Sequence, residues 1–280
     1  MQPQRALTID EVRTLAPSVF ATQPWEEVSD KYQFIPTIDI VKNLINDGWD
    51  VTKAGQQRTL LPSKKEFTKH ILRFRRPVNA HSMTVGDIFP EIVLTNSHDR
   101  GAAYQMMAGL FRLACTNGFT VADATFSHIS IRHQGQDTIP AVKSSVNDII
   151  NGLPCILSGV KEMQEIELTS DERLEMATVA MAMKYDDDTL KHTNLEPEML
   201  LKKRRYVDEK PDLWTTFNVI QENLIKGGIA FKKELYTDDQ NILHPARNSK
   251  TRAVVSINED LRLNKDLWEL ATAMKELKAA

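Results

Sequence analysis

The sequence predicts an α+β protein, with a small mixed or antiparallel sheet and packed helices in its first half and a mostly helical second half. Two observations favour this class. Segments with alternating or apolar side chains, which are typical of strands, gather between residues 69 and 133. Long amphipathic patterns with start and stop signals follow from residue 141 onward. Sheet and helix are therefore separated along the chain.

The first half begins with a short helical stretch, Ile9 to Leu15, followed by a loop that contains proline and tryptophan. Residues 32–36 (YQFIP) are strand-like, and a helix is expected from about Thr37 until Asp47-Gly48 supplies a C-terminal glycine signal. Alternation then predicts a strand at residues 69–76, KHILRFRR.

Residues 91–95 (EIVLT) form the next expected strand, and residues 119–133 form one long or bulged strand. Between them, the polar cluster Asn96-Ser97-His98-Asp99 precedes a wide apolar stretch. This order predicts a helix that starts near Gly101, capped by Ser97 or Asp99, and ends at Asn117-Gly118.

Helical patterns dominate the second half. A helix over residues 141–166 is interrupted at Pro154, and Thr169 begins another at capping-box spacing from Glu172. A third helix has Pro211 in its first turn and ends at Gly227-Gly228, and residues 258–277 form the last. We expect an N-terminal extension (1–30), an α+β core (31–185) and a helical C-terminal subdomain packed on the core (186–280).

Composition excludes several classes of protein. The 280 residues carry a net charge of −3, so the chain is no wholly basic nucleic-acid coat, although a local basic groove is compatible with that charge. No apolar run approaches the roughly 18 residues of a membrane span, and the first residues lack the order of a signal peptide. The two cysteines, Cys115 and Cys155, form no CxxC pair. We therefore expect reduced structural thiols in a bacterial cytoplasm.

Three segments resemble one known family. They are NSHD with GLFRLACTNGF (96–119), LWTTFNVIQENLIKGG (213–228) and TRAVVSINEDLRLNKDLWELA (251–271). The chain resembles the phage/plasmid-like protein family, also called domain of unknown function 932, over roughly residues 30 to 275. The resemblance implies an origin in a bacteriophage or plasmid. It implies no established reaction and carries over no catalytic residue.

Two basic runs are candidate nucleic-acid-binding sites. The first sets seven basic residues against the single acid Glu66, and its strand pattern puts Arg73 and Arg75 on one face about 7 Å apart. The second lies beside Tyr206, and basic residues next to an aromatic ring suit single-stranded nucleic acid. Alternatively, either run is a solvated surface or a partner for acidic segments. The candidates are Lys64, Lys65, Lys69, Arg73, Arg75, Arg76, Lys202, Lys203, Arg204 and Arg205, with Arg58 also in the first run.

A possible polar groove is the third candidate. Strand alternation in FSHISIRH sends polar side chains to one side, and a helix start with nearby arginine favours anions. The alternatives are an exposed sheet face and a simple helix cap. The groove residues are His98, Arg100, His128, Ser130 and Arg132.

No metal, cofactor or catalytic residue is expected, since HExxH, P-loop and GxSxG motifs are absent. The favoured function is a phage or plasmid accessory protein of DNA metabolism and recombination that binds single-stranded nucleic acid as a homo-oligomer, as an annealing or protection factor. A sheet crossed by a long helix is compatible with annealing proteins by fold analogy alone. The alternative is a host-interaction protein, anti-restriction or anti-defence, that acts through an acidic surface such as EMQEIELTSDERLE. A metal-dependent nuclease is the third hypothesis.

Overall fold

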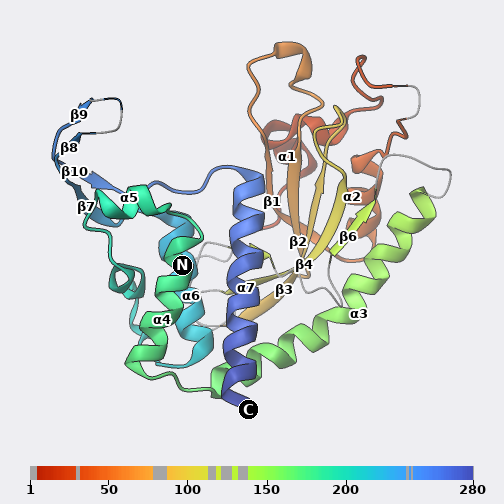
Figure 1. The fold of residues 1–280 in the computed structure, drawn as a ribbon. Coiled ribbons are helices and arrows are strands. Elements are labelled where there is room, and N and C mark those ends of the chain that lie inside the picture. The colour runs from red at the N-terminus through yellow and green to blue at the C-terminus, as the bar shows by residue number, and fades with distance from the viewer. Residues whose placement is uncertain are drawn as a thin grey trace. The chain divides into compact units, whose positions relative to one another are not determined.

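A computed structural model describes residues 5–29, 32–77, 87–112, 118–120, 128–131, 138–237, 240 and 242–279. The chain divides into two compact units, residues 1–156 and 157–280. Figure 1 traces both, with a sheet in the first and mostly helices in the second. This confirms the predicted α+β class. The expected division at residues 30 and 185 stays a prediction.

The sheet of the first unit is antiparallel throughout. β1 to β4 lie in sequence order, and β5 and β6 both pair with the outer edge of β4. Their bounds are β1 (Asp50–Gln56), β2 (His70–Arg75), β3 (Ile88–Asn96), β4 (Tyr104–Arg112), β5 (Gly118–Thr120) and β6 (His128–Ile131). The strands predicted at 69–76 and 91–95 are confirmed as β2 and the centre of β3.

Helices of the first unit follow local sequence signals. α1 (Ile9–Leu15) begins at a capping box between Thr8 and Glu11. α2 (Thr37–Asn46) buries Ile40, Val41 and Leu44, as its apolar spacing predicts. The remaining elements are the 3₁₀ turns η1 (Pro17–Phe20) and η2 (Pro62–Lys64), and α3 (Thr138–Glu165), which continues into residues of the second unit. No strand forms at residues 32–36, so that prediction is wrong.

The helix predicted from Gly101 is also wrong, because residues 104–112 form β4. β4 pairs with β3 from Gln105–Thr95 to Arg112–Ile88, and eight of its nine residues are buried. A strand buried on both faces has a continuous apolar sequence, and such a run cannot be told from a buried helix by its periodicity. The predicted helix end at Asn117 lies outside the described residues.

The polar cluster before β4 therefore shapes a hairpin turn and caps no helix. Gly101 N donates to Asp99 Oδ1 (2.9 Å), and Ala102 N donates to Ser97 Oγ (2.8 Å). Arg100 adopts a left-handed backbone conformation with φ 65°. The same Ser97 and Asp99 oxygens that suit a helix start here accept from the amides of a tight turn.

One long strand was predicted at 119–133, and the structure instead describes two short strands, β5 and β6, along one edge of β4. β5 pairs with Gly109–Phe111 and β6 with Tyr104–Met107, both antiparallel to β4. The residues between them lie outside the described part.

The second unit is helical, as predicted. α4 (Ser170–Ala182) starts at the expected capping box of Thr169 and Glu172. α6 is capped by Asp212, so Pro211 precedes the helix rather than standing in its first turn. The other helical elements are α5 (Asp187–Lys191), α6 (Leu213–Lys226), α7 (Ile257–Ala279), η4 (Pro197–Leu201) and η5 (Tyr206–Asp208).

α6 is the core of this unit. Every residue from Leu213 to Ile225 is buried, and Phe217 packs between Trp214 and Trp268, with ring centroids 5.6 and 6.0 Å away. Its polar side chains are satisfied inside the unit, as when Gln221 donates to Asn264 at 2.9 Å.

The end of α6 requires glycine. Gly227 has φ 62° and ψ −146°, and a Cβ there would lie 2.6 Å from the carbonyl oxygen of Thr251. This confirms the predicted stop at Gly227-Gly228. Two small two-stranded sheets follow that the sequence did not predict: β7 (Ala230–Lys233) with β10 (Arg247–Lys250), and β8 (Tyr236–Thr237) with β9 (Leu243–His244).

Both cysteines were expected to be structural. Cys155 is a free, exposed thiol on α3, so that expectation is wrong for it. Cys115 lies outside the described residues. Pro154 stands inside α3, and the kink predicted there stays a prediction.

Candidate nucleic-acid interface

The first basic run is divided between surface and interior. Arg58, Lys65 and Arg76 are exposed, and Lys64 is half-buried, with its Nζ 3.9 Å from the ring centroid of Trp25. Lys69 is buried, and this burial lowers the pKa of its ammonium. The run therefore presents fewer charges to solvent than its sequence suggests.

Arg73 and Arg75 share one face of β2, as predicted, but that face is buried. They are 2% and 4% exposed, and both bind Glu91 on the neighbouring strand, with N–O distances of 3.1 and 2.7 Å. The Arg75 guanidinium also lies 3.7 Å from the centroid of Phe111. Alternation fixes the face on which a strand residue lies, whereas its exposure depends on what covers that face. Neither guanidinium is presented to solvent in the described structure, and their predicted role as nucleic-acid ligands stays a prediction that this burial does not favour.

The second run is also partly committed to internal contacts. Arg205 binds both carboxylate oxygens of Glu222, at 2.5 and 2.6 Å. Arg204 donates to Asn223 Oδ1 and to the carbonyl oxygen of Gly227. Lys202 and Lys203 are exposed, and Tyr206, close to them in the chain, is 86% exposed. This part of the run is therefore available for binding.

The groove candidates whose side chains the structure describes, His98, Arg100 and Ser130, do not gather on one surface. His128 and Ser130 belong to β6, in register with Met107 and Gln105 of β4. By this register Ser130 shares the sheet face of Arg73 and Arg75. Ser130 is exposed, whereas Arg132 lies outside the described residues. Arg100 is exposed in the β3–β4 turn.

His98 is fully buried in a polar network behind the opposite sheet face. Thr37 Oγ1 lies 3.4 Å from His98 Nε2, 3.0 Å from His70 Nε2 and 3.0 Å from Asn96 Nδ2. Ser18 Oγ completes the network at 2.9 Å from His70 Nδ1. These contacts join α2 and η1 to β2 and the end of β3, so His98 serves the packing of the first unit.

A more exposed basic surface lies in the second unit, outside the two basic runs and the groove predicted from the sequence. We call residues 192–194 and 229–250 the wing. β7 and β10 pair Lys232 with Asn248 and Ala230 with Lys250, and all four of these residues are exposed. Lys232 and Lys250 are diagonal neighbours, which places their Cβ atoms about 7–8 Å apart. An open cleft of about 600 Å³ lies here, lined by Asn194, Ala230, Phe231, Lys232, Asn248, Ser249 and Lys250.

The wing is held in shape by the segment after α5. Asn194 N donates to the Lys232 carbonyl oxygen at 3.1 Å, Lys232 N donates to Asn194 Oδ1 at 2.6 Å, and Glu234 N donates to the carbonyl oxygen of His192 at 3.0 Å. This segment thus runs along the free edge of β7 like a third strand.

Aromatic rings form a stack at the far end of the wing. Tyr236 lies 3.7 Å from His192 and 4.5 Å from His244 between ring centroids, with interplanar angles of 10° and 9°. Residues 226–256 carry six lysines and arginines against three acids. Exposed cations next to stacked rings are the combination expected for a surface that binds single-stranded nucleic acid.

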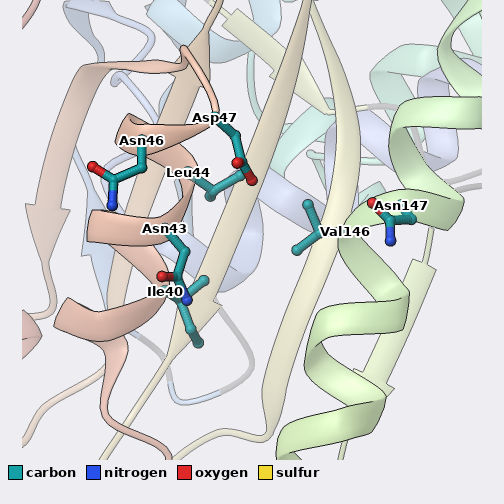
Figure 2. A pocket seen from close by; sticks show the side chains of 7 residues that line it. All are labelled: Ile40, Asn43, Leu44, Asn46, Asp47, Val146 and Asn147. Carbon is teal, nitrogen blue, oxygen red and sulfur yellow. The ribbon is translucent and has the colours of Figure 1, made fainter.

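A second cleft, of about 450 Å³, lies in the first unit between α2 and α3. Figure 2 shows Ile40 and Leu44 of α2 facing Val146 of α3, with the amides of Asn43 and Asn147 nearby. Asp47 is the one charged residue among the described residues that line it.

A family model for a domain of unknown function (DUF932) matches residues 24–268. The chain belongs to the DUF932 family. It is 34% identical over 270 residues to the UPF0380 protein YafZ of Escherichia coli K12, covering 96% of this chain and 92% of YafZ. It is also 34% identical over 275 residues to the UPF0380 protein YfjQ of the same strain, with the same coverage. No solved structure matches the chain significantly.

The described part of this DUF932 protein contains no group of three or more His, Cys, Asp or Glu residues that could hold a metal ion. Among the same residues, no helix is long and apolar enough to cross a membrane.

The wing could have been suspected from one signal in the sequence. Residues 230–237 (AFKKELYT) combine two lysines with two aromatic residues after a glycine pair. Its strands are two to four residues long, however, and such short strands carry too little alternation to predict.

Proposed function

We propose that this DUF932 protein binds single-stranded nucleic acid as an accessory factor of phage or plasmid DNA metabolism, and that the wing is its main contact surface. The observation that carries the proposal is the exposed β7–β10 face with Lys232 and Lys250. Two cations at this diagonal separation suit neighbouring phosphates of an extended strand. The charges of the wing are exposed to solvent. Arg73 and Arg75, in contrast, are paired with a buried carboxylate.

Single strands are favoured over duplex for a geometric reason. In the wing, Phe231 lines the open cleft together with Lys232 and Lys250, and the rings of His192, Tyr236 and His244 stack on one another. Unpaired bases stack on such rings, whereas bases in a duplex are already stacked. Lys202, Lys203 and Tyr206 are a further exposed basic and aromatic group in the same unit and would extend the contact. An annealing or protection role is consistent with this mode of binding.

The test is oligonucleotide affinity as a function of salt concentration. Fluorescence anisotropy of a labelled single-stranded oligonucleotide should show binding at low salt that weakens as salt rises. In the double variant Lys232→Ala/Lys250→Ala, the slope of log affinity against log salt should become shallower by about 1.4, because each lost single-strand phosphate contact contributes about 0.7. An unlabelled duplex of the same sequence should compete weakly.

A matched control separates the wing from charge in general. Lys161 and Lys265 are exposed lysines of the same unit outside the wing, so Lys161→Ala/Lys265→Ala removes the same charge elsewhere. This control should retain the wild-type slope. The proposal fails if wild-type protein does not bind at low salt, or if both double variants lose affinity equally.

A host-interaction role through an acidic surface is the second candidate. Glu165, Glu167, Asp171 and Glu175 are exposed at the end of α3 and on α4. Other acids of this region already have partners, since Glu162 binds Lys275 and Glu172 binds Lys278. If the oligonucleotide experiment shows no binding, a basic protein partner for these four carboxylates becomes the favoured function.

A further inference from the structure

We infer that copies of this protein contact one another through the loop between β1 and β2, whose leucine tip inserts into the α2–α3 cleft of a second copy. The loop, residues 57–69, projects past the ends of β1 and β2 (Figure 1). The inference is independent of the proposed function, because it concerns other residues and needs no nucleic acid.

The tip exposes apolar side chains to an unusual degree. Leu60 is 100% exposed and Leu61 is 54% exposed, and the exposed Pro62 follows them. Exposed leucines that stand singly need no explanation, but two in a row on a projecting loop form an apolar knob that association would cover.

The loop is ordered, so the knob is presented in a fixed position. Gln57 N donates to the carbonyl oxygen of Lys69 at 2.7 Å, and Gln56 Nε2 donates to that of Lys65 at 2.8 Å. Lys64 rests on the ring of Trp25. A loop that is already ordered loses little conformational entropy on binding, which favours association.

The α2–α3 cleft can accommodate this knob in size and has the opposite charge. Its volume of about 450 Å³ is large enough for small side chains. Its lining is mixed, with the apolar residues Ile40, Leu44 and Val146 beside the polar residues Asn43, Asn46, Asp47 and Asn147 (Figure 2). Asp47 lies at the cleft, and the adjacent Asp148 is exposed.

Around the knob, the basic side chains Arg58, Lys64 and Lys65 outnumber the acid Glu66. The knob and the cleft are different surfaces of one chain, so each copy offers one of each. Such a contact is heterologous and can repeat from copy to copy into a ring or a filament. It is small for a specific interface, so we expect a dissociation constant in the micromolar range.

Sedimentation velocity across a micromolar concentration series tests the inference. Wild-type protein should show a weight-average mass that rises above the single-chain mass of 31.8 kDa. The knob variant Leu60→Asp/Leu61→Asp and the cleft variant Asp47→Lys/Val146→Arg should each raise the dissociation constant at least tenfold. Leu277→Asp changes a leucine that is 73% exposed on α7 and should associate like wild type. Circular dichroism checks that each variant is folded.

Mixing the two variants provides the decisive outcome. The knob variant keeps an intact cleft and the cleft variant keeps an intact knob, so an equimolar mixture should form a one-to-one pair and nothing larger. The inference is overturned if wild type stays at the single-chain mass throughout, if the knob variant associates like wild type, or if the mixture forms no pair. Loss of oligonucleotide affinity in the knob variant, with wild type monomeric, would instead assign the knob to nucleic acid.

Discussion

Replacing Glu91 with glutamine tests the buried ion pairs of the sheet. Glu91 is 1% exposed and is the carboxylate that Arg73 and Arg75 share, with contacts at 3.1 and 2.7 Å. Glutamine has nearly the same shape, so the change removes the negative charge and leaves little cavity. Two buried guanidiniums then lose a charged partner.

The expected cost follows from this geometry. Removing one partner of a buried ion pair costs about 3–5 kcal/mol, since an uncompensated charge stays in the interior. For a unit of this size, 1 kcal/mol lowers the unfolding midpoint by about 2–4 °C. We therefore expect the midpoint of the Glu91→Gln variant to fall by about 6–20 °C.

Differential scanning calorimetry measures this change, because it resolves the unfolding of two units if they unfold separately. Glu66→Gln is the control, since Glu66 is an exposed acid between β1 and β2 and its loss should stay within about 0.5 kcal/mol. A midpoint for Glu91→Gln that matches this control would refute the argument. The two arginines would then be solvated or paired elsewhere, and their role as phosphate ligands would be favoured again.

Three further predictions concern single positions. Gly227→Ala should lower stability by at least about 1–3 kcal/mol in urea unfolding, because its Cβ would meet the Thr251 oxygen, whereas Gly228→Ala, with nothing within 4 Å of its Cβ, should cost less. Phe111→Ala should cost about 3–5 kcal/mol in the same assay, since Phe111 is 5% exposed, and an unchanged midpoint would show that its face is not packed. Burial raises the pKa of Glu222, but hydrogen bonds from Arg205 and Lys226 outweigh it and hold that pKa below its usual value. Its contribution to stability is therefore present above the unfolded pKa and lost as pH falls through the lower folded pKa. Thermal midpoints should then decline below about pH 4.5 less steeply in Glu222→Gln than in wild type.

Local signals predicted the helices well. The capping boxes at Thr8 and Thr169 and the glycine pair at 227–228 each act within one turn of the chain, so the sequence alone determines them. The helix predicted over residues 101–116 was wrong because a helix and a buried strand favour the same apolar composition. Pairing with β3 decides between the two, and pairing is a long-range interaction that a local pattern does not contain.

The candidate site was predicted less well than the fold, for a related reason. The alternation in β2 correctly placed Arg73 and Arg75 on one face, but their partner Glu91 is sixteen residues from Arg75 along the chain. Runs of like charge draw attention in a sequence even when distant carboxylates neutralise them. The cations of the wing are scattered between residues 232 and 250 and converge only because β7 pairs with β10.

The burial of α6 on every side also bears on how the second unit opens. Its amides can exchange with solvent only when the surrounding helices separate, so α6 should be the last segment of residues 157–280 to take up deuterium. The wing contributes no residue to this buried helix and should exchange early. Insertions, deletions or protease cuts in the wing would then leave the cooperative unfolding of the helices intact. Relatives could thus vary the wing in length and charge while keeping one inherited core.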